Sequence, residues 1–215
     1  MEFDECAARG RRVVTLPDFY FLRHGETDWN VALRLQGGTD IPLNARGRQQ
    51  ATDNGALLSK TLVSIGRAPD QFRFVASPMS RARETMERAR TAMGLDPTAY
   101  ETDQRLIELT FGRWEGFTFA ELMKTDQAPL VEARRANKWH FVPPGGESYE
   151  MLAMRISGYL SDLNEPTVIV AHGGVFRAIN YLLRPGLDPD DTAEANVPQD
   201  RIFEHRNRSE EHTSE

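Results

Sequence analysis

The sequence predicts an α/β fold: a three-layer α/β/α sandwich around a central, mainly parallel (mixed) sheet. Three short apolar runs, at residues 19–22, 73–76 and 167–171, have the length and the aliphatic or aromatic content of buried strands. Segments with helical spacing follow these runs, and such alternation is typical of parallel sheets. Polar residues come directly after each run, so we expect the three strands to form the floor of one site.

Spacing and capping signals place the other elements. Asn44 is expected to cap one helix, and Thr118 to open another through a capping box with Glu121. Helices are predicted at 31–35, 45–60, 118–136 (divided at Pro129), 146–163 and 175–183, edge strands at 99–102 and 201–204, and a loop over 186–198.

Length and composition predict one soluble globular domain. The 215 residues are 40% hydrophobic and 27% charged, which is enough apolar content for a core. The net charge of −6 argues against nucleic acid or an anionic membrane as a partner, and the longest apolar run is too short to span a bilayer. A single cysteine, Cys6, and an N-terminus without an apolar signal region lead us to expect a cytoplasmic location. Oligomeric state is left open.

We divide the chain into three parts. Residues 1–17 are predicted to be a loose leader, residues 18–205 the folded domain, and residues 206–215 a disordered tail without core-forming side chains. The tail is similar to the translation of a sequencing adapter, so we interpret it as a read-through artefact that replaces the natural C-terminus. His212 is therefore excluded from the candidate site.

Two of the predicted strands end in His-Gly. The first leads into Arg23, His24 and Gly25, and the third into His172 and Gly173. Open α/β sheets bind ligands at the carboxyl ends of their strands, and a helix N-terminus there favours anions. Either histidine alone is compatible with a structural role. The pair predicts two imidazoles that converge on one site, with a cation beside the first.

A helix start follows the second predicted strand. Ser77 is expected to cap this helix and Pro78 to occupy its first position. Arg81 then lies in the first turn, where a cation is unfavourable against the helix dipole. A bound anion would remove that cost, so we predict that Arg81 binds an anion, whereas the other arginines of this helix suit a solvated face.

These motifs resemble the histidine phosphatase superfamily, which includes cofactor-dependent phosphoglycerate mutases, fructose-2,6-bisphosphatases and α-ribazole phosphatases. The resemblance rests on Arg23-His24-Gly25-Glu26-Thr27 and on His172-Gly173, runs from about residue 18 to about residue 183, and implies a phosphoglycerate mutase-like fold. Four further blocks match the family's patterns, at 40–51, 77–85, 106–116 and 145–148.

The resemblance also selects the proton donor. From the residues alone, Glu108 and Glu115 are both open candidates, although the neighbours of Glu108 are apolar. The family's Leu-x-Glu-x-x-x-Gly-x-Trp-Glu-Gly block places its acid at the position of Glu108. The residue is therefore expected to protonate the leaving alkoxide and then, as a carboxylate, to activate water.

The implied mechanism needs neither a metal nor a cofactor. His24 would attack phosphorus and form a phosphohistidine. Arg23 and Arg81 would bind the phosphoryl oxygens, and a protonated His172 would add positive charge. Five residues are expected to bind the small phosphorylated substrate, with Asn30 as a neutral donor: Thr27, Asn30, Gln36, Gly37 and Gly173. Selectivity is expected from the segments near Gln36-Gly37 and at 117–138 and 140–144; the substrate itself is not specified.

Three alternatives are kept beside a phosphatase. His24, His172 and Glu108 would suit a hydrolytic zinc centre, but Arg23 would repel the cation and His-x-His and His-Glu-x-x-His spacings are absent. A phosphoglycerate mutase is the second alternative; family mutases have a longer segment between acid and second histidine than the 64 positions found here. A silent phospholigand-binding domain is the third, although silent members typically lose a site residue and each expected one is present.

Overall fold

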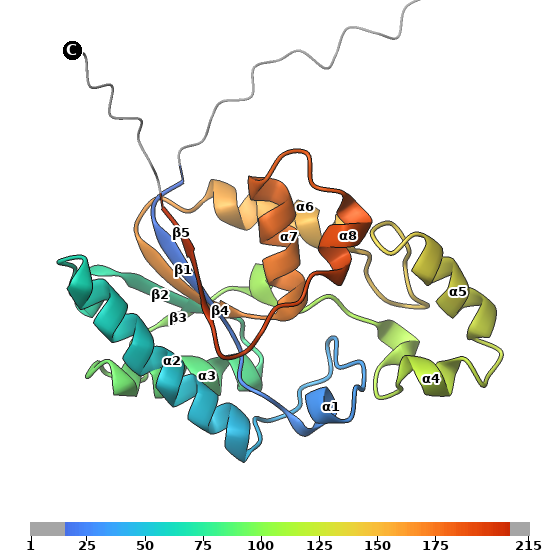
Figure 1. The fold of residues 1–215 in the computed structure, drawn as a ribbon, viewed down its shortest axis with the longest axis horizontal. Coiled ribbons are helices and arrows are strands. Elements are labelled where there is room, and N and C mark those ends of the chain that lie inside the picture. Colours follow the sequence, from blue (N-terminus) through green and yellow to red (C-terminus); the bar gives the residue numbers. More distant parts are fainter. Residues whose placement is uncertain (1–15, 207–215) are drawn as a thin grey trace, which may run out of the picture.

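The computed structural model describes residues 16–206, whose fold is shown in Figure 1. The predicted leader and tail lie outside these residues except at positions 16, 17 and 206. Leu16 is 8% exposed and belongs to the core beside the sheet. Among the described residues, no helix is both long and apolar enough to cross a bilayer.

Five strands form one mixed sheet in the order β3-β2-β4-β1-β5. Neighbouring strands are parallel except at the β1–β5 pair, which is antiparallel. The predicted fold class is therefore confirmed. The strands are β1 (Phe19–Arg23), β2 (Arg73–Ala76), β3 (Glu101–Thr102), β4 (Thr167–Ala171) and β5 (Ile202–His205).

Helices cover both faces of the sheet (Figure 1), so most residues of its strands β1, β2 and β4 are buried. In β1, Phe19 and Phe21 pack in the core that contains α6 and α7, whereas Tyr20 and Leu22 pack in the core that contains α2 and α3. The helices are α1 (Asp28–Val31), α2 (Ala45–Ser64), α3 (Ser80–Ala92), α4 (Phe119–Leu122), α5 (Ala128–Ala136), α6 (Tyr149–Ser161), α7 (Gly173–Leu183) and α8 (Pro189–Glu194), with 3₁₀ turns at Pro69–Gln71, Gln104–Leu106 and Gly112–Trp114.

A small third core lies beside the three layers. Trp114, Leu122 and Val131 pack together with Leu35, and the indole of Trp114 stacks on Phe141. This core joins the segment after α1 to α4 and α5, which lie at one side of the molecule in Figure 1. The segment that carries Glu108 connects the two regions, because Leu109 belongs to the core that contains α6 and α7 and Phe111 packs against both that core and the small one.

The expected helix at 31–35 is wrong. α1 starts earlier, because Thr27 and Asn30 form a capping box at its N-terminus. It ends after one turn, and Leu33 adopts φ 55°, in the left-handed region that stops a helix. Leu35 instead donates its backbone N–H to the carbonyl of Phe117.

The expected cap of α3 is also wrong. The helix begins at Ser80, with Met79 rather than Ser77 at the N-cap position. The carboxylate of Asp40 accepts from the backbone N–H of Ser80 at 3.0 Å and from its hydroxyl at 2.8 Å. An acid from a distant segment thus takes the capping role, while the hydroxyl of Ser77 accepts from the backbone N–H of Met79 at 3.4 Å.

Prolines explain two further differences. Pro129 does not divide two helices but lies in the first turn of α5, where its missing N–H costs nothing. The segment expected to be a loop over 186–198 contains α8, which Asp188 caps and Pro189 opens. The predicted caps at Asn44 and Thr118 are confirmed, as are the strands at 19–22, 73–76 and 167–171. The helix expected at 146–163 is α6, which Ser148 caps and which begins at Tyr149.

Two glycines allow the turn after β1 to pack directly on α2. A Cβ on Gly25 would lie 2.2 Å from the carbonyl oxygen of Gly47, and one on Gly47 would lie 2.1 Å from that of Glu26. These neighbours are backbone atoms and cannot rotate away. Only glycine at both positions lets α2 fix the turn that carries His24.

We expect Gly47→Ala to destabilise the protein because the added methyl group overlaps backbone. The free energy of unfolding in urea should fall by about 1–3 kcal/mol. Gly158→Ala, in α6, is the matched control: a Cβ there meets nothing within 4 Å, so helix propensity should raise stability by about 0.5–1 kcal/mol. Equal stabilities of the two variants would contradict the close approach.

Candidate active site

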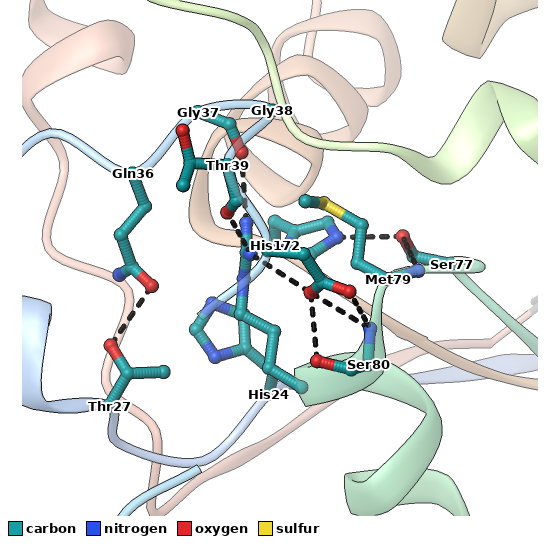
Figure 2. A network of polar contacts seen from close by, with 12 residues as sticks. His24, Thr27, Gln36, Gly37, Gly38, Thr39, Ser77, Met79, Ser80 and His172 are labelled. Atoms are coloured by element: carbon teal, nitrogen blue, oxygen red, sulfur yellow. Dashed lines mark hydrogen bonds and ion pairs between the residues drawn. The ribbon is translucent and has the colours of Figure 1, made fainter. Parts of the chain in front are cut away.

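The pairing of β1 with β4 brings the two histidines together. The register places Arg23 beside Ala171, so His24 and His172 leave the sheet at the same edge. Their ring centroids are 5.1 Å apart at an interplanar angle of 59°, and both side chains are buried. Figure 2 shows the two imidazoles next to each other.

A backbone carbonyl fixes the tautomer of His24. Nδ1 lies 2.8 Å from the carbonyl oxygen of Gly25. A carbonyl only accepts hydrogen bonds, so Nδ1 carries the proton and Nε2 carries the lone pair. The imidazole is therefore oriented as a nucleophile needs to be.

His172 is held by a residue from a third strand end. Its Nε2 lies 2.8 Å from the hydroxyl oxygen of Ser77, which directly follows β2. Its Nδ1 is enclosed and has no hydrogen-bond partner within the described protein. One ring nitrogen thus anchors the imidazole and the other is left for a ligand.

Both imidazoles are kept neutral by their surroundings. Burial, and then the charges of Arg81 and Arg23, hold the pKa of His24 well below its ordinary value. Burial, Arg81 and His24 depress the pKa of His172 in the same way. The protein's own groups therefore favour an uncharged His172, whereas an adjacent dianion would act in the opposite direction.

Arg23 lies beside the imidazoles with its charge uncompensated. One terminal nitrogen donates to the carbonyl oxygen of Val197 at 2.6 Å, and Nε is enclosed without a partner. Burial lowers the pKa of Arg23 to about 10, although the charge of Glu108 partly offsets this. Because a pKa of about 10 is still well above neutral pH, Arg23 remains a cation.

Arg81 is 1% exposed and is also held by carbonyl oxygens. Its terminal nitrogens donate to the carbonyls of Thr39 at 2.9 Å and Gly37 at 3.0 Å, in the network of Figure 2. The carboxylate of Asp40 forms a long ion pair with a terminal nitrogen of Arg81, at 3.8 Å, and Nε of Arg81 has no hydrogen-bond partner within the described residues. The guanidinium is thus fixed in direction and keeps donors for an anion.

Glu108 is half-buried and lies against the start of α7. One carboxylate oxygen accepts from the backbone N–H of Gly174 at 3.0 Å and the other from that of Leu109 at 2.9 Å. A Cβ on Gly174 would lie 2.3 Å from the carboxylate, so the second glycine after His172 provides the space for the acid. The charge of Glu108 acts on both Arg23 and Arg81, which places it near the two cations.

The model of the histidine phosphatase superfamily (branch 1) matches residues 19–204. The chain belongs to this superfamily. A glucosyl-3-phosphoglycerate phosphatase of Mycobacterium tuberculosis is 32% identical over 188 residues, covering 81% of this chain and 76% of the relative. Phosphoglycerate mutase-like protein 4 of Arabidopsis thaliana is 32% identical over 178 residues, covering 80% and 73%. The solved structure of mycobacterial hydrolase 1 has a TM-score of 0.73 at 28% identity, covering 87% and 88%.

Membership of the superfamily confirms the resemblance and places the chain among phosphatases.

The remaining candidate residues of this histidine phosphatase divide into two groups. Asn30 accepts from the side chain of Gln199 through its oxygen, at 3.0 Å, which leaves its amide nitrogen to donate. Gly173 packs against the side chain of Arg23, since a Cβ at position 173 would be 3.4 Å from Nε of Arg23.

The other three candidates make hydrogen bonds within the protein. The hydroxyl of Thr27 lies 2.9 Å from the side-chain oxygen of Gln36, and both residues are buried (Figure 2). Thr27 also caps α1. The carbonyl of Gly37 accepts from Arg81. The structure therefore gives these residues bonds that shape the walls of the site.

Sequence reasoning missed several residues that hold the site together. Thr85 accepts from the backbone N–H of Gly25 at 3.1 Å, and Gln199 donates to the carbonyl of His24 at 3.2 Å. Ser77 and Thr85 belonged to a block that matched the family, so a signal existed for both. Val197 and Gln199 lie in the segment expected to be a loop or its border, where no motif marks them.

The depressed pKa values of His24 and His172 predict a loss of stability in acid. The unfolded chain takes up a proton on each imidazole near pH 6.5, whereas the folded protein does so only at lower pH. The free energy of unfolding should therefore fall as the pH drops below about 6.5, by up to about 1.4 kcal/mol per pH unit for each histidine. Urea unfolding between pH 7.5 and 5 measures the slope.

The control for this slope is a histidine outside the site. His24→Asn should make the pH dependence shallower, because one of the two groups is removed. His140→Asn, whose side chain is 53% exposed, is the matched control for the removal of an imidazole at the surface. An unchanged slope in His24→Asn would show that its pKa is not depressed.

Proposed function

We propose that this histidine phosphatase hydrolyses small phosphomonoesters through a phosphohistidine at Nε2 of His24, without a metal ion. The observation that carries the proposal is a neutral, oriented imidazole beside two guanidinium groups that donate to backbone carbonyls, with the carboxylate of Asp40 beyond hydrogen-bond distance, at 3.8 Å from Arg81. Negative charge on the phosphoryl oxygens is the main obstacle to attack at phosphorus. Arg23 and Arg81 would neutralise that charge.

In the first step, the Nε2 lone pair of His24 forms a bond to phosphorus as the bond to the leaving oxygen breaks. Glu108, in its protonated form, gives its proton to that oxygen, and the alcohol departs. The carbonyl of Gly25 stabilises the positive charge that develops on the imidazole, because it accepts from Nδ1. Nδ1 of His172 and the amide nitrogen of Asn30 would donate to the transferred group.

In the second step, water attacks phosphorus and the bond to His24 breaks. Glu108, now a carboxylate, takes the proton from the water, and inorganic phosphate leaves. The enzyme returns to its starting state, so one ester and one water give one alcohol and one phosphate. Arginine supplies the positive charge that a metal supplies in other phosphatases.

The substrate is proposed to be a small phosphorylated metabolite. The name of the Mycobacterium tuberculosis relative supports this class. A mutase activity is the second candidate, since the Arabidopsis thaliana relative is named mutase-like. The short segment between Glu108 and His172 favours the phosphatase. Cytoplasmic location is part of the proposal and is supported by the single cysteine.

Removal of the nucleophile tests the covalent step. The wild-type protein should release phosphate from p-nitrophenyl phosphate in the presence of EDTA and should retain radiolabelled phosphate after acid-free rapid denaturation. His24→Ala should lose both properties, whereas His140→Ala should retain them. A labelled His24→Ala would contradict the proposal, because the phosphoryl group would then be on another residue. A wild-type protein that binds phosphate without turnover would contradict it as well and would favour a silent binding domain.

Glu108→Gln tests the proton donor. An alkyl phosphate has a poor leaving group, so its kcat should fall on the order of 100- to 10,000-fold. p-Nitrophenolate leaves without a proton, so the formation of phosphohistidine from p-nitrophenyl phosphate should fall much less. Glu132→Gln, at an exposed residue of α5, is the control. Equal losses on both substrates would assign Glu108 another role.

A further inference from the structure

Glu115 is the acid that the sequence could not separate from Glu108, and the structure gives it a different place. We propose that Glu115 is a positioning residue that sets the guanidinium of Arg81 and the segment of Glu108 relative to each other. The inference rests on the proposed function, because it assigns the way in which the phosphate-binding and proton-donating groups are aligned. It is supported by contacts of the Glu115 carboxylate with two segments that are distant from each other in the sequence, at 38–39 and 110–111.

Four donors surround the carboxylate of Glu115. Oε1 accepts from the backbone N–H of Gly38 at 2.8 Å, and Oε2 from the hydroxyl of Thr39 at 2.5 Å. Oε1 also accepts from the hydroxyl of Thr110 at 2.7 Å and the backbone N–H of Phe111 at 3.0 Å. Two donors come from the loop after α1 and two from the segment after Glu108. The carboxylate therefore joins two parts of the chain that are more than 70 positions apart.

The first pair of contacts controls Arg81. The loop at 37–39 carries the two carbonyl oxygens, of Gly37 and Thr39, to which Arg81 donates. Glu115 binds the backbone of Gly38 and the side chain of Thr39, so it fixes the same short loop from its other side. Arg81 itself is not touched. Its direction is set through the loop.

The second pair of contacts controls the proton donor. Thr110 and Phe111 lie two and three residues after Glu108, and the backbone of Thr110 also accepts from the N–H of Glu147 at 2.9 Å. Glu108 has backbone contacts of its own at Leu109 and Gly174. A loosened turn at 110–111 would therefore shift the acid against α7.

The space for the carboxylate is built into the loop. Gly37 has φ 49°, and a Cβ there would lie 2.2 Å from Oε1 of Glu115 and 2.8 Å from the backbone nitrogen of Phe111. A side chain at position 37 would push the loop away from Glu115. This gives the glycine a physical role besides its carbonyl bond to Arg81.

The charge of Glu115 suits this role. Burial opposes ionisation, but hydrogen bonds from Thr39, Thr110 and two backbone N–H groups outweigh it and hold the pKa of Glu115 below its ordinary value. The ionised carboxylate contributes attraction to Arg81 without occupying its N–H groups. An acid in direct contact with Arg81 would instead compete with a phosphate.

The test separates the two sets of contacts with isosteric variants. Thr39→Val removes a donor on the Arg81 side. Thr110→Val removes one on the Glu108 side, together with the acceptor for the backbone N–H of Gly112. Phosphate binding is measured as the inhibition constant of inorganic phosphate and by calorimetry. Proton donation is measured as the ratio of kcat for p-nitrophenyl phosphate to kcat for an alkyl phosphate.

Each variant has its own expected result. Thr39→Val should weaken phosphate binding by about tenfold, the loss of one hydrogen bond to a charged group, and change the kcat ratio little. Thr110→Val should raise the kcat ratio by about tenfold and change phosphate binding little. Glu115→Gln should both weaken phosphate binding and raise the kcat ratio, because it alters both sets of contacts. Glu101→Gln is the matched control, since Glu101 accepts two hydrogen bonds from Arg73 but lies in the edge strand β3, outside the segments that form the site.

Coupling through Arg81 gives an independent measurement. Arg81→Lys and Glu115→Gln should have non-additive effects on phosphate binding, because they act on one group. Glu115→Gln with an altered melting temperature but wild-type phosphate binding and kcat ratio would overturn the inference. If Glu115→Gln does not fold, Thr39→Val and Thr110→Val provide the test. Wild-type phosphate binding and a wild-type kcat ratio in both variants would overturn the inference. A wild-type protein that neither binds nor releases phosphate would instead overturn the proposed function.

Discussion

Backbone carbonyl oxygens, and not carboxylates, hold the two guanidinium groups of the site. Val197 accepts from Arg23, and Gly37 and Thr39 accept from Arg81. A carbonyl fixes the direction of a guanidinium without cancelling its charge, and the carboxylates of Glu108, Asp40 and Glu115 offset the desolvation of these cations only in part and without a hydrogen bond to either. Burial, and then these same charges, keep the imidazoles neutral. The two arginines thus contribute both to the affinity for a phosphoryl group and to the nucleophilicity of His24.

The sheet brings these groups to one place. β1, β4 and β2 are neighbours and parallel, so the residues that follow them, His24, His172 and Ser77, leave at a common edge. Close backbone approach then matters more than side-chain packing. A methyl group on Gly25 would overlap the backbone of α2, and one on Gly174 would overlap the carboxylate of Glu108. The edge of the sheet is therefore built from strand ends and glycines, and loops from elsewhere supply the acceptors that aim the cations.

Much of this arrangement could be predicted from the sequence, because its signals are local. Apolar runs marked the strands, and the repeated His-Gly marked the strand ends. Arg81 stood out because a cation in a first turn needs a compensating anion. The cap of α3 could not be predicted, since Asp40 comes from a distant loop. Val197 contributes only a carbonyl, which every residue has, and Glu115 differs from Glu108 only in its three-dimensional contacts.

The segment between α8 and β5 ties a distant part of the chain to the nucleophile. It provides the carbonyl for Arg23 and the side chain of Gln199, which binds the backbone of His24 across 175 positions. Closing a loop of this length costs conformational entropy, which the packing of the sheet and its helices must offset. The orientation of the cation beside His24 therefore depends on the folding of the whole domain and not only on the strand that carries it.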